Sequence, residues 1–143
     1  MGKINFENKL IAIVRVRGRI KVREPIEETM ERLNLRKPNM LAIVYATKPY
    51  VGMINKCRDF VTFGEIDKQT LLRLIEKNGK KVDDGLLDDL ISGKKSLKEI
   101  EIQPFFRLHP PRKGYEKTRL PYSTGGAVGY RGNAINELIR RMT

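Results

Sequence analysis

The sequence contains one cysteine, one histidine and no long hydrophobic run. With Cys57 alone, no internal disulfide can form, and a reducing compartment is expected. No apolar run approaches the roughly 18 residues that a membrane-spanning helix requires. The opening residues, MGKINFENKL, have no apolar stretch of signal-peptide length. We therefore expect a cytoplasmic protein with no membrane partner.

Residues suited to catalysis or metal binding are scarce. The single histidine, His109, has no evident catalytic partner, and Cys57 falls on the apolar face of a predicted helix. Free cysteines in such positions usually pack in the core. One acidic cluster lacks the alternating oxygen ligands of a calcium loop and fits a helix cap with a solvated face; it comprises Asp83, Asp84, Asp88 and Asp89. We predict no enzyme activity, no metal and no cofactor.

Positive charge is abundant and unevenly distributed. The 143 residues carry a net charge of +12, with a sequence pI near 10.0. Residues 1–23 contain seven basic residues and one acidic residue, and residues 104–143 contain eight basic and two acidic residues. Between them, basic and acidic residues are equal in number. A surface made basic only for solubility would spread its charge along the chain. Charge confined to the two ends favours a polyanionic partner, most often nucleic acid.

Residues 9–65 alternate between strand and helix patterns. Strands are predicted at KLIAIVRV, MLAIVYA and FVTF, and helices at EPIEETMERLNL and from Thr47 onward, with Pro25 and Pro49 near the two helix starts. Short crossovers predict parallel neighbouring strands with both helices on one side, leaving the other face uncovered unless another segment lies on it. The predicted fold class is α/β, with a split β-α-β, ferredoxin-like core and an open sheet.

The pattern changes after Gly64. Helices are predicted from Asp67 to Asn78-Gly79, over DDGLLDDLISG and over the closing NAINELIRRM, and EIQPFFRL is predicted to be extended. Ser96 and Glu99 have capping-box spacing. We therefore divide the chain into a core domain, residues 1–65, and a C-terminal extension, residues 66–143.

The segment RLHPPRKGYEKTRLPYSTGGAVGYRGN has no aliphatic run that could form a core of its own. Its arginines and lysines alternate with tyrosines, and these side chains bind phosphates and stack on bases. Prolines keep such a segment extended, and glycines let its backbone approach a ligand. Ordering it alone costs more entropy than it recovers, so we expect it to order on a partner.

Three motifs suggest other functions. TGGAVG lacks the Lys-Ser/Thr pair and the preceding strand of a phosphate loop, and DFVTF lacks the basic-glycine-aromatic start of the RNA-recognition signature. We expect Phe60 and Phe63 to be packing residues. VRGRIKVR is similar to the acylphosphatase loop, but Lys21 stands where that family has a second glycine. A small acyl-phosphate or phosphate-ester hydrolase using Arg19 or Arg23 remains an alternative.

Two stretches together resemble a known family. IAIVRVRGRIKVREPIEETMERLNLRKPN and VGMINKCRDFVTFGEI are similar to the universal large-subunit ribosomal protein family numbered thirty in bacteria and seven in eukaryotes. Its glycine-methionine-isoleucine step and following basic pair are matched by Gly52, Met53, Ile54, Lys56 and Arg58. PFFRLHPPRKGY and GYRGNAINELIRRM resemble the longer archaeal and eukaryotic form. The long basic N-terminal arm of eukaryotic members is absent, which favours an archaeal-type member.

The resemblance implies a structural constituent of the large ribosomal subunit that binds and stabilises large-subunit rRNA and aids subunit assembly. It further implies a monomer within the ribosome, beside neighbouring ribosomal proteins. By matched position, RNA contacts are expected at Arg15, Arg17, Arg19, Lys21, Arg23, Lys56 and Arg58. The resemblance and the charge argument together add Arg107, Arg112, Lys113, Tyr115, Lys117, Arg119 and Arg131. The main alternative is a free-standing RNA-binding or assembly factor.

Overall fold

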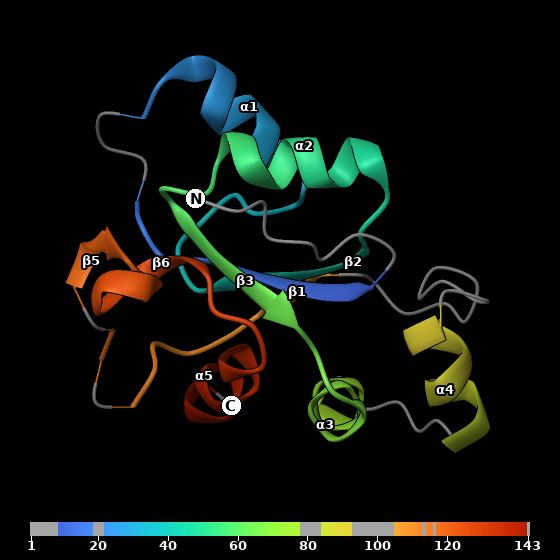
Figure 1. Cartoon of the computed structure of the whole chain (residues 1–143). Helices are drawn as coiled ribbons and strands as arrows, with labels where there is room; N and C mark the ends of the chain where they lie inside the picture. The colour runs from blue at the N-terminus through green and yellow to red at the C-terminus, as the bar shows by residue number, and fades with distance from the viewer. Residues whose placement is uncertain are drawn as a thin grey trace.

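The computed structural model describes residues 9–18, 22–77, 84–92, 105–112, 114–115 and 117–142. Its strands form one six-stranded sheet in the order β4-β2-β1-β3-β6-β5, with helices on both faces (Figure 1). The strands are β1 (Leu10–Arg15), β2 (Met40–Tyr45), β3 (Val61–Glu65), β4 (Phe105–Arg107), β5 (Lys117–Pro121) and β6 (Gly126–Tyr130). The helices are α1 (Glu24–Arg32), α2 (Lys48–Lys56), α3 (Lys68–Lys77), α4 (Asp84–Ser92) and α5 (Ala134–Met142), with a short 3-10 helix, η2 (Tyr122–Thr124).

The α/β class and the split β-α-β core are confirmed, but the predicted strand directions are wrong. β1 lies between β2 and β3 and is antiparallel to both. The right-handed crossover rule applies to β2 and β3, which run in the same direction because each is antiparallel to β1. Periodicity located the strands correctly but does not report which strand is inserted between two others.

Helices α1 and α2 cover one face of the sheet, as expected (Figure 1). Ile11 and Ile13 of β1 pack there in one cluster with Met30 of α1 and with Ile54 and Cys57 at α2. All five side chains are fully buried. Alternate residues of β1 point to this face because successive side chains of a strand lie on opposite sides of the sheet.

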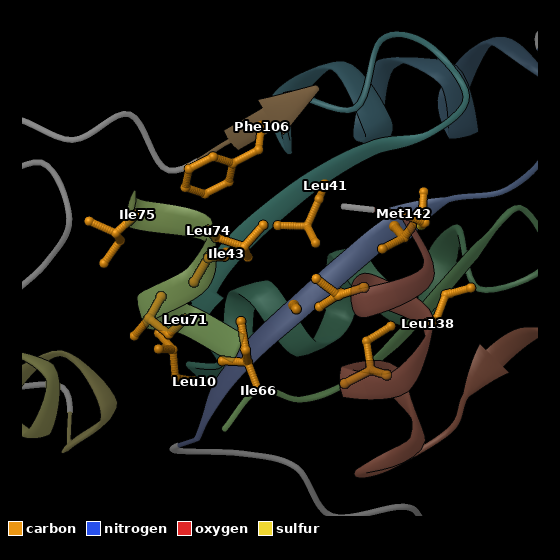
Figure 2. Packing of buried hydrophobic residues seen from close by; sticks show 14 of the residues in the cluster. Leu10, Leu41, Ile43, Ile66, Leu71, Leu74, Ile75, Phe106, Leu138 and Met142 are labelled. Atoms are coloured by element: carbon orange, nitrogen blue, oxygen red, sulfur yellow. The ribbon is translucent and has the colours of Figure 1, made fainter. Parts of the chain in front are cut away.

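The C-terminal segment covers the second face. Leu10, Ala12 and Val14 of β1 belong to a cluster with residues of α3, α4, α5 and β4, and Figure 2 shows part of this packing, with Leu138 and Met142 of α5 among the labelled side chains. The expectation that residues 107–133 order only on a partner is wrong for β6, because Ala127 and Val128 are buried in a cluster with Val16. These few apolar residues complete a core that the rest of the chain mainly supplies.

Strands from both predicted segments share this sheet. β4 pairs antiparallel with β2, and β6 pairs parallel with β3. The predicted cap of α3 is present, since the backbone N–H of Thr70 donates to Oδ1 of Asp67 at 2.7 Å. Asn136 of α5 accepts from the N–H of Asp67 at 2.9 Å, so side-chain hydrogen bonds tie α5 to the start of α3. The predicted capping pair at Ser96 and Glu99 lies outside the described residues.

Alanine substitutions at two glycines should change the free energy of unfolding in opposite directions. A Cβ on Gly64 would lie 2.0 Å from the backbone oxygen of Gly132, whereas a Cβ on Gly52, in helix α2, would have no atom within 4 Å. We expect Gly64→Ala to lower the free energy of unfolding by about 3 kcal/mol, because neither backbone can give way easily. Gly52→Ala should raise it by about 0.5–1 kcal/mol through helix propensity. Urea unfolding of both variants checks this; equal effects would show that Gly64 is not packed against backbone.

Candidate nucleic-acid interface

The strand directions bring separate basic segments to one end of the sheet. β1 is antiparallel to β2 and β3, β6 is parallel to β3, and β4 is antiparallel to β2. The carboxyl ends of β1 and β4 therefore meet the amino ends of β2, β3 and β6. We call this the basic end of the sheet, because most of the predicted RNA-contacting cations precede or follow these strand ends in the chain. Six of these cations have side chains that the structure describes as exposed or half-buried: Arg17, Arg23, Lys56, Arg58, Arg107 and Arg112.

The opposite end of the sheet carries acidic groups. Glu65 ends β3 there, and Asp67 begins the turn into α3. Tyr130 donates a hydrogen bond to Oε1 of Glu65, and Lys9 Nζ lies 3.6 Å from the same oxygen. Burial, then the hydrogen bond to Glu65, raises the pKa of Tyr130 to about 12. Arg140 likewise lies 4.0 Å from Asp67, so the acidic groups at this end are accompanied by cations.

Arg17 and the residues before β3 form one part of the basic end. The guanidinium of Arg17 lies over the ring of Phe60, 4.8 Å from its centroid. The N–H groups of Val16 and Arg17 both donate to the carbonyl of Phe60. Lys56 and Arg58, which precede Phe60, are exposed. The fold therefore brings Arg17 beside the segment that carries Lys56 and Arg58.

Arg15 lies inside the protein. Its side chain is fully buried, and Nη1 and Nη2 donate to the two carboxylate oxygens of Glu27 at 3.2 and 2.9 Å. Nη1 also donates to the carbonyl of Leu35 at 2.8 Å, and Nε to that of Arg17 at 3.0 Å. An RNA phosphate cannot reach this guanidinium in the folded domain. The position does not support the RNA contact that the family match implies for Arg15.

Arg131 is likewise 6% exposed. Its Nε donates to Oγ1 of Thr62 and its Nη2 to the carbonyl of Ala127, both at 2.7 Å. The ring of Tyr122 packs on the guanidinium, 4.8 Å from centroid to carbon. Arg131 therefore ties β3 to β6 and supports Tyr122, whose side chain is partly exposed. We leave Arg15 and Arg131 out of the proposed contact set.

The remaining tail residues have varied positions. Arg107 at the end of β4 and Arg112 beyond it are exposed. Tyr115 is half-buried and donates to Oδ1 of Asn39 at 2.6 Å, so its hydroxyl already has a protein partner. Burial raises the pKa of Tyr115 to about 12. Lys117 and Arg119 lie on β5; the other predicted contacts, Arg19, Lys21 and Lys113, fall outside the described residues.

Side chains suited to catalysis do not gather in the described part of the chain. Cys57 is fully buried in the α1–α2 face, where desolvation raises its pKa to about 12, so its thiol is a packing group as predicted. Phe63 is also buried, and Phe60 is half-buried beneath Arg17. Among the described residues, no three His, Cys, Asp or Glu side chains are placed to hold a metal ion. His109 is exposed beyond β4.

Two cations near this end, Arg36 and Lys37, precede β2 and are exposed, but they are not among the predicted contacts. A basic pair directly before a buried strand was the available signal. Its meaning depends on strand direction, because only the antiparallel arrangement puts the start of β2 beside the end of β1.

A split β-α-β domain with exposed cations from several segments gathered at one end of the sheet defines a small α/β protein suited to binding a polyanion. Residues 11–61 match the sequence profile of the family described as ribosomal protein L30p/L7e. The chain is 44% identical to the large ribosomal subunit protein uL30 of Nanoarchaeum equitans, over 92% of this chain and 97% of that protein. It is 43% identical to the uL30 protein of Methanococcus maripaludis with the same coverage, and 40% identical to that of Korarchaeum cryptofilum.

The chain belongs to the ribosomal protein L30p/L7e family. Similarity to archaeal relatives over nearly their whole length confirms the resemblance found in the sequence, including its longer archaeal form. In the described part of the chain, no helix is long and apolar enough to cross a membrane.

Proposed function

We propose that this protein is a structural constituent of the large ribosomal subunit, where its basic end binds large-subunit rRNA and stabilises the rRNA fold during and after assembly. The observation that carries the proposal is the convergence of cations from four separate segments at one end of a single sheet. The family and the names of its archaeal members support the ribosomal context. The role is one of binding and shape, without catalysis.

The mechanism is electrostatic. Arginine and lysine side chains neutralise phosphates and release condensed counterions, which supplies most of the affinity for an RNA backbone. Double-stranded RNA is recognised mainly by its shape and its phosphate and 2′-hydroxyl groups, so a rigid surface of cations suits it. In this domain Phe60 supports Arg17, and the protein core supports the strands from which the other cations project.

The positions that we assign to rRNA contact are the exposed or half-buried cations Arg17, Arg23, Lys56, Arg58, Arg107 and Arg112, and by sequence Arg19, Lys21, Lys113, Lys117 and Arg119. Neighbouring ribosomal proteins are expected partners for the rest of the surface. Tyr115 is assigned a supporting role, because its hydroxyl holds Asn39 and its ring packs beside Val16 and β6.

Sedimentation tests the proposal directly. A tagged copy of the full chain, expressed in an archaeal host, is followed through sucrose gradients at moderate and then at high salt. We expect near-complete recovery with large subunits and translating ribosomes at both salt concentrations. Recovery in the light fractions, or only with immature particles, would instead identify a free RNA-binding protein or an assembly factor.

A further inference from the structure

An open pocket of about 450 Å³ lies beside the edge of the sheet, at the basic end. It is lined by Asn34, Arg36, Lys37, Met40, Phe105 and Arg107. Its volume falls within the roughly 300–1,000 Å³ typical of sites for small organic groups. None of the lining side chains is acidic, and three are cationic. The pocket therefore suits a compact, negatively charged group.

The strand pairing builds one wall of the pocket. Met40 of β2 lies opposite Arg107 of β4, and Ala42 lies opposite Phe105. Directly opposed residues point to the same face, and residues two apart on a strand share that face. Phe105 and Arg107 therefore stand side by side above Met40. Phe105 is half-buried and also packs against the cluster beneath α1 and α2, which holds its ring in place.

The turn after α1 builds the other wall. Asn34 has a positive φ of 63°, which turns the chain sharply at the end of the helix. The next residue, Leu35, is fully buried; its carbonyl accepts from buried Arg15 and its N–H donates to the carbonyl of Met30. These contacts fix the backbone directly before Arg36 and Lys37. Both exposed cations thus project from an anchored turn.

The lining combines two chemistries that match the two parts of a nucleotide. Cations bind the phosphate, and an aromatic ring with a methionine offers a flat apolar surface on which a base can stack. The backbone of an RNA duplex would use only the cations, because its bases are stacked inside the helix. Sequence-specific proteins commonly bind bases that have left the helix in this way. An acidic peptide would satisfy the charges but leave Phe105 without a stacking partner.

We propose that this pocket receives one unpaired nucleotide of the large-subunit rRNA, with its base against Phe105 and its phosphate held by Arg36, Lys37 and Arg107. The inference rests on the proposed ribosomal function and adds a defined contact to it. Phe105 supplies the stacking surface beside the buried Met40, and buried Arg15 positions the turn that carries two of the three cations.

Chemical probing of rRNA in assembled subunits tests this proposal. Full-length wild type, Phe105→Leu, Lys37→Gln and the control Lys48→Gln, whose exposed lysine starts α2 at the opposite end of the sheet, each replace the resident copy in an archaeal host. Purified large subunits are probed with dimethyl sulfate and with a 2′-hydroxyl acylating reagent. Leucine keeps the apolar packing of position 105 but removes the aromatic surface.

We expect all four proteins to enter subunits. In Phe105→Leu, one unpaired nucleotide should become roughly fivefold or more reactive, because losing one aromatic stacking partner weakens base binding by at least about that factor. Lys37→Gln should expose the same nucleotide less strongly, and Lys48→Gln should leave it unchanged. Normal incorporation with an unchanged reactivity pattern would overturn the nucleotide pocket while leaving the proposed function intact. Absence from subunits of every variant and of wild type would overturn the proposed function instead.

Ultraviolet cross-linking of wild-type subunits provides a second measurement that does not depend on any variant. We expect a peptide containing Phe105 or Met40 to carry the mass of a single nucleotide derived from large-subunit rRNA. A cross-link from this peptide to another protein, or reactivity changes confined to paired nucleotides, would overturn the proposal. Saturable binding of adenosine 5′-monophosphate by the isolated chain, with no change in the subunit, would assign the pocket to free nucleotides and also overturn it.

Discussion

Binding of the isolated chain to large-subunit rRNA is expected to weaken about 10³–10⁵-fold between roughly 50 and 200 mM salt, if about six to ten phosphates are contacted. Each neutralised phosphate releases counterions, and added salt opposes that release. Six of the cations assigned to contact are exposed or half-buried in the described residues, and five more are assigned by sequence. Filter binding of purified protein to large-subunit rRNA over a salt series measures the slope.

Single substitutions show how much each position contributes to the slope of log affinity against log salt concentration. Arg58→Gln removes an exposed cation directly before β3, at the basic end, and should lower the magnitude of the slope by about one. Lys48→Gln, at the opposite end, removes the same charge and should leave the slope nearly unchanged. A total dependence of less than about tenfold over the same salt range would contradict phosphate contact as the source of affinity. Equal effects of the two substitutions would contradict the assignment of a basic end.

Replacing Arg15 by alanine is expected to lower the free energy of unfolding by about 3–5 kcal/mol. The change removes the four hydrogen bonds that this fully buried guanidinium donates, two to the carboxylate of Glu27 and one each to the carbonyls of Leu35 and Arg17. It also removes a large side chain from the core beneath α1. The lost hydrogen bonds and the cavity left in the core dominate this estimate.

Urea unfolding followed by circular dichroism measures the loss. The control is Arg17→Ala, two residues away, which removes a half-exposed arginine and its contact with Phe60 and should cost no more than about 1 kcal/mol. Replacing Arg15 and Glu27 together by methionine should recover most of the stability, because apolar groups of similar volume often replace a buried ion pair without loss. A loss below about 1 kcal/mol in Arg15→Ala would mean that the guanidinium remains hydrated.

The local elements of the core were predictable because their signals are local. Pro25 and Pro49 lie in the first turns of α1 and α2, and Asp67 caps α3 through its own side chain. The hydrophobic runs of β1, β2 and β3 appear as strands close to their predicted bounds. Such signals depend on residues within one or two helical turns of each other, and the sequence contains them in full.

The candidate site was only partly predictable. Clustered cations indicated the segments that we propose to face a polyanion, but Arg15 and Arg131 are buried, whereas Arg17 and Arg112, with the same charge, are not. Arg15 meets Glu27 and Leu35 across 12 and 20 residues, and Arg131 meets Thr62 across 69. Which arginine is buried depends on these distant acceptors, so charge and spacing alone could not separate a structural arginine from an exposed one.

The amino-acid sequence by itself determined the family, the alternation of strands and helices and the concentration of positive charge near the two chain ends, because each is a property of residue order. Tertiary structure decided the insertion of β1 between β2 and β3, the burial of α5 on the second face and the pocket between Asn34 and Arg107. These features depend on pairing between segments far apart in the chain. A strand's own residues specify that it pairs, while the free energy of the whole packed sheet selects its partner.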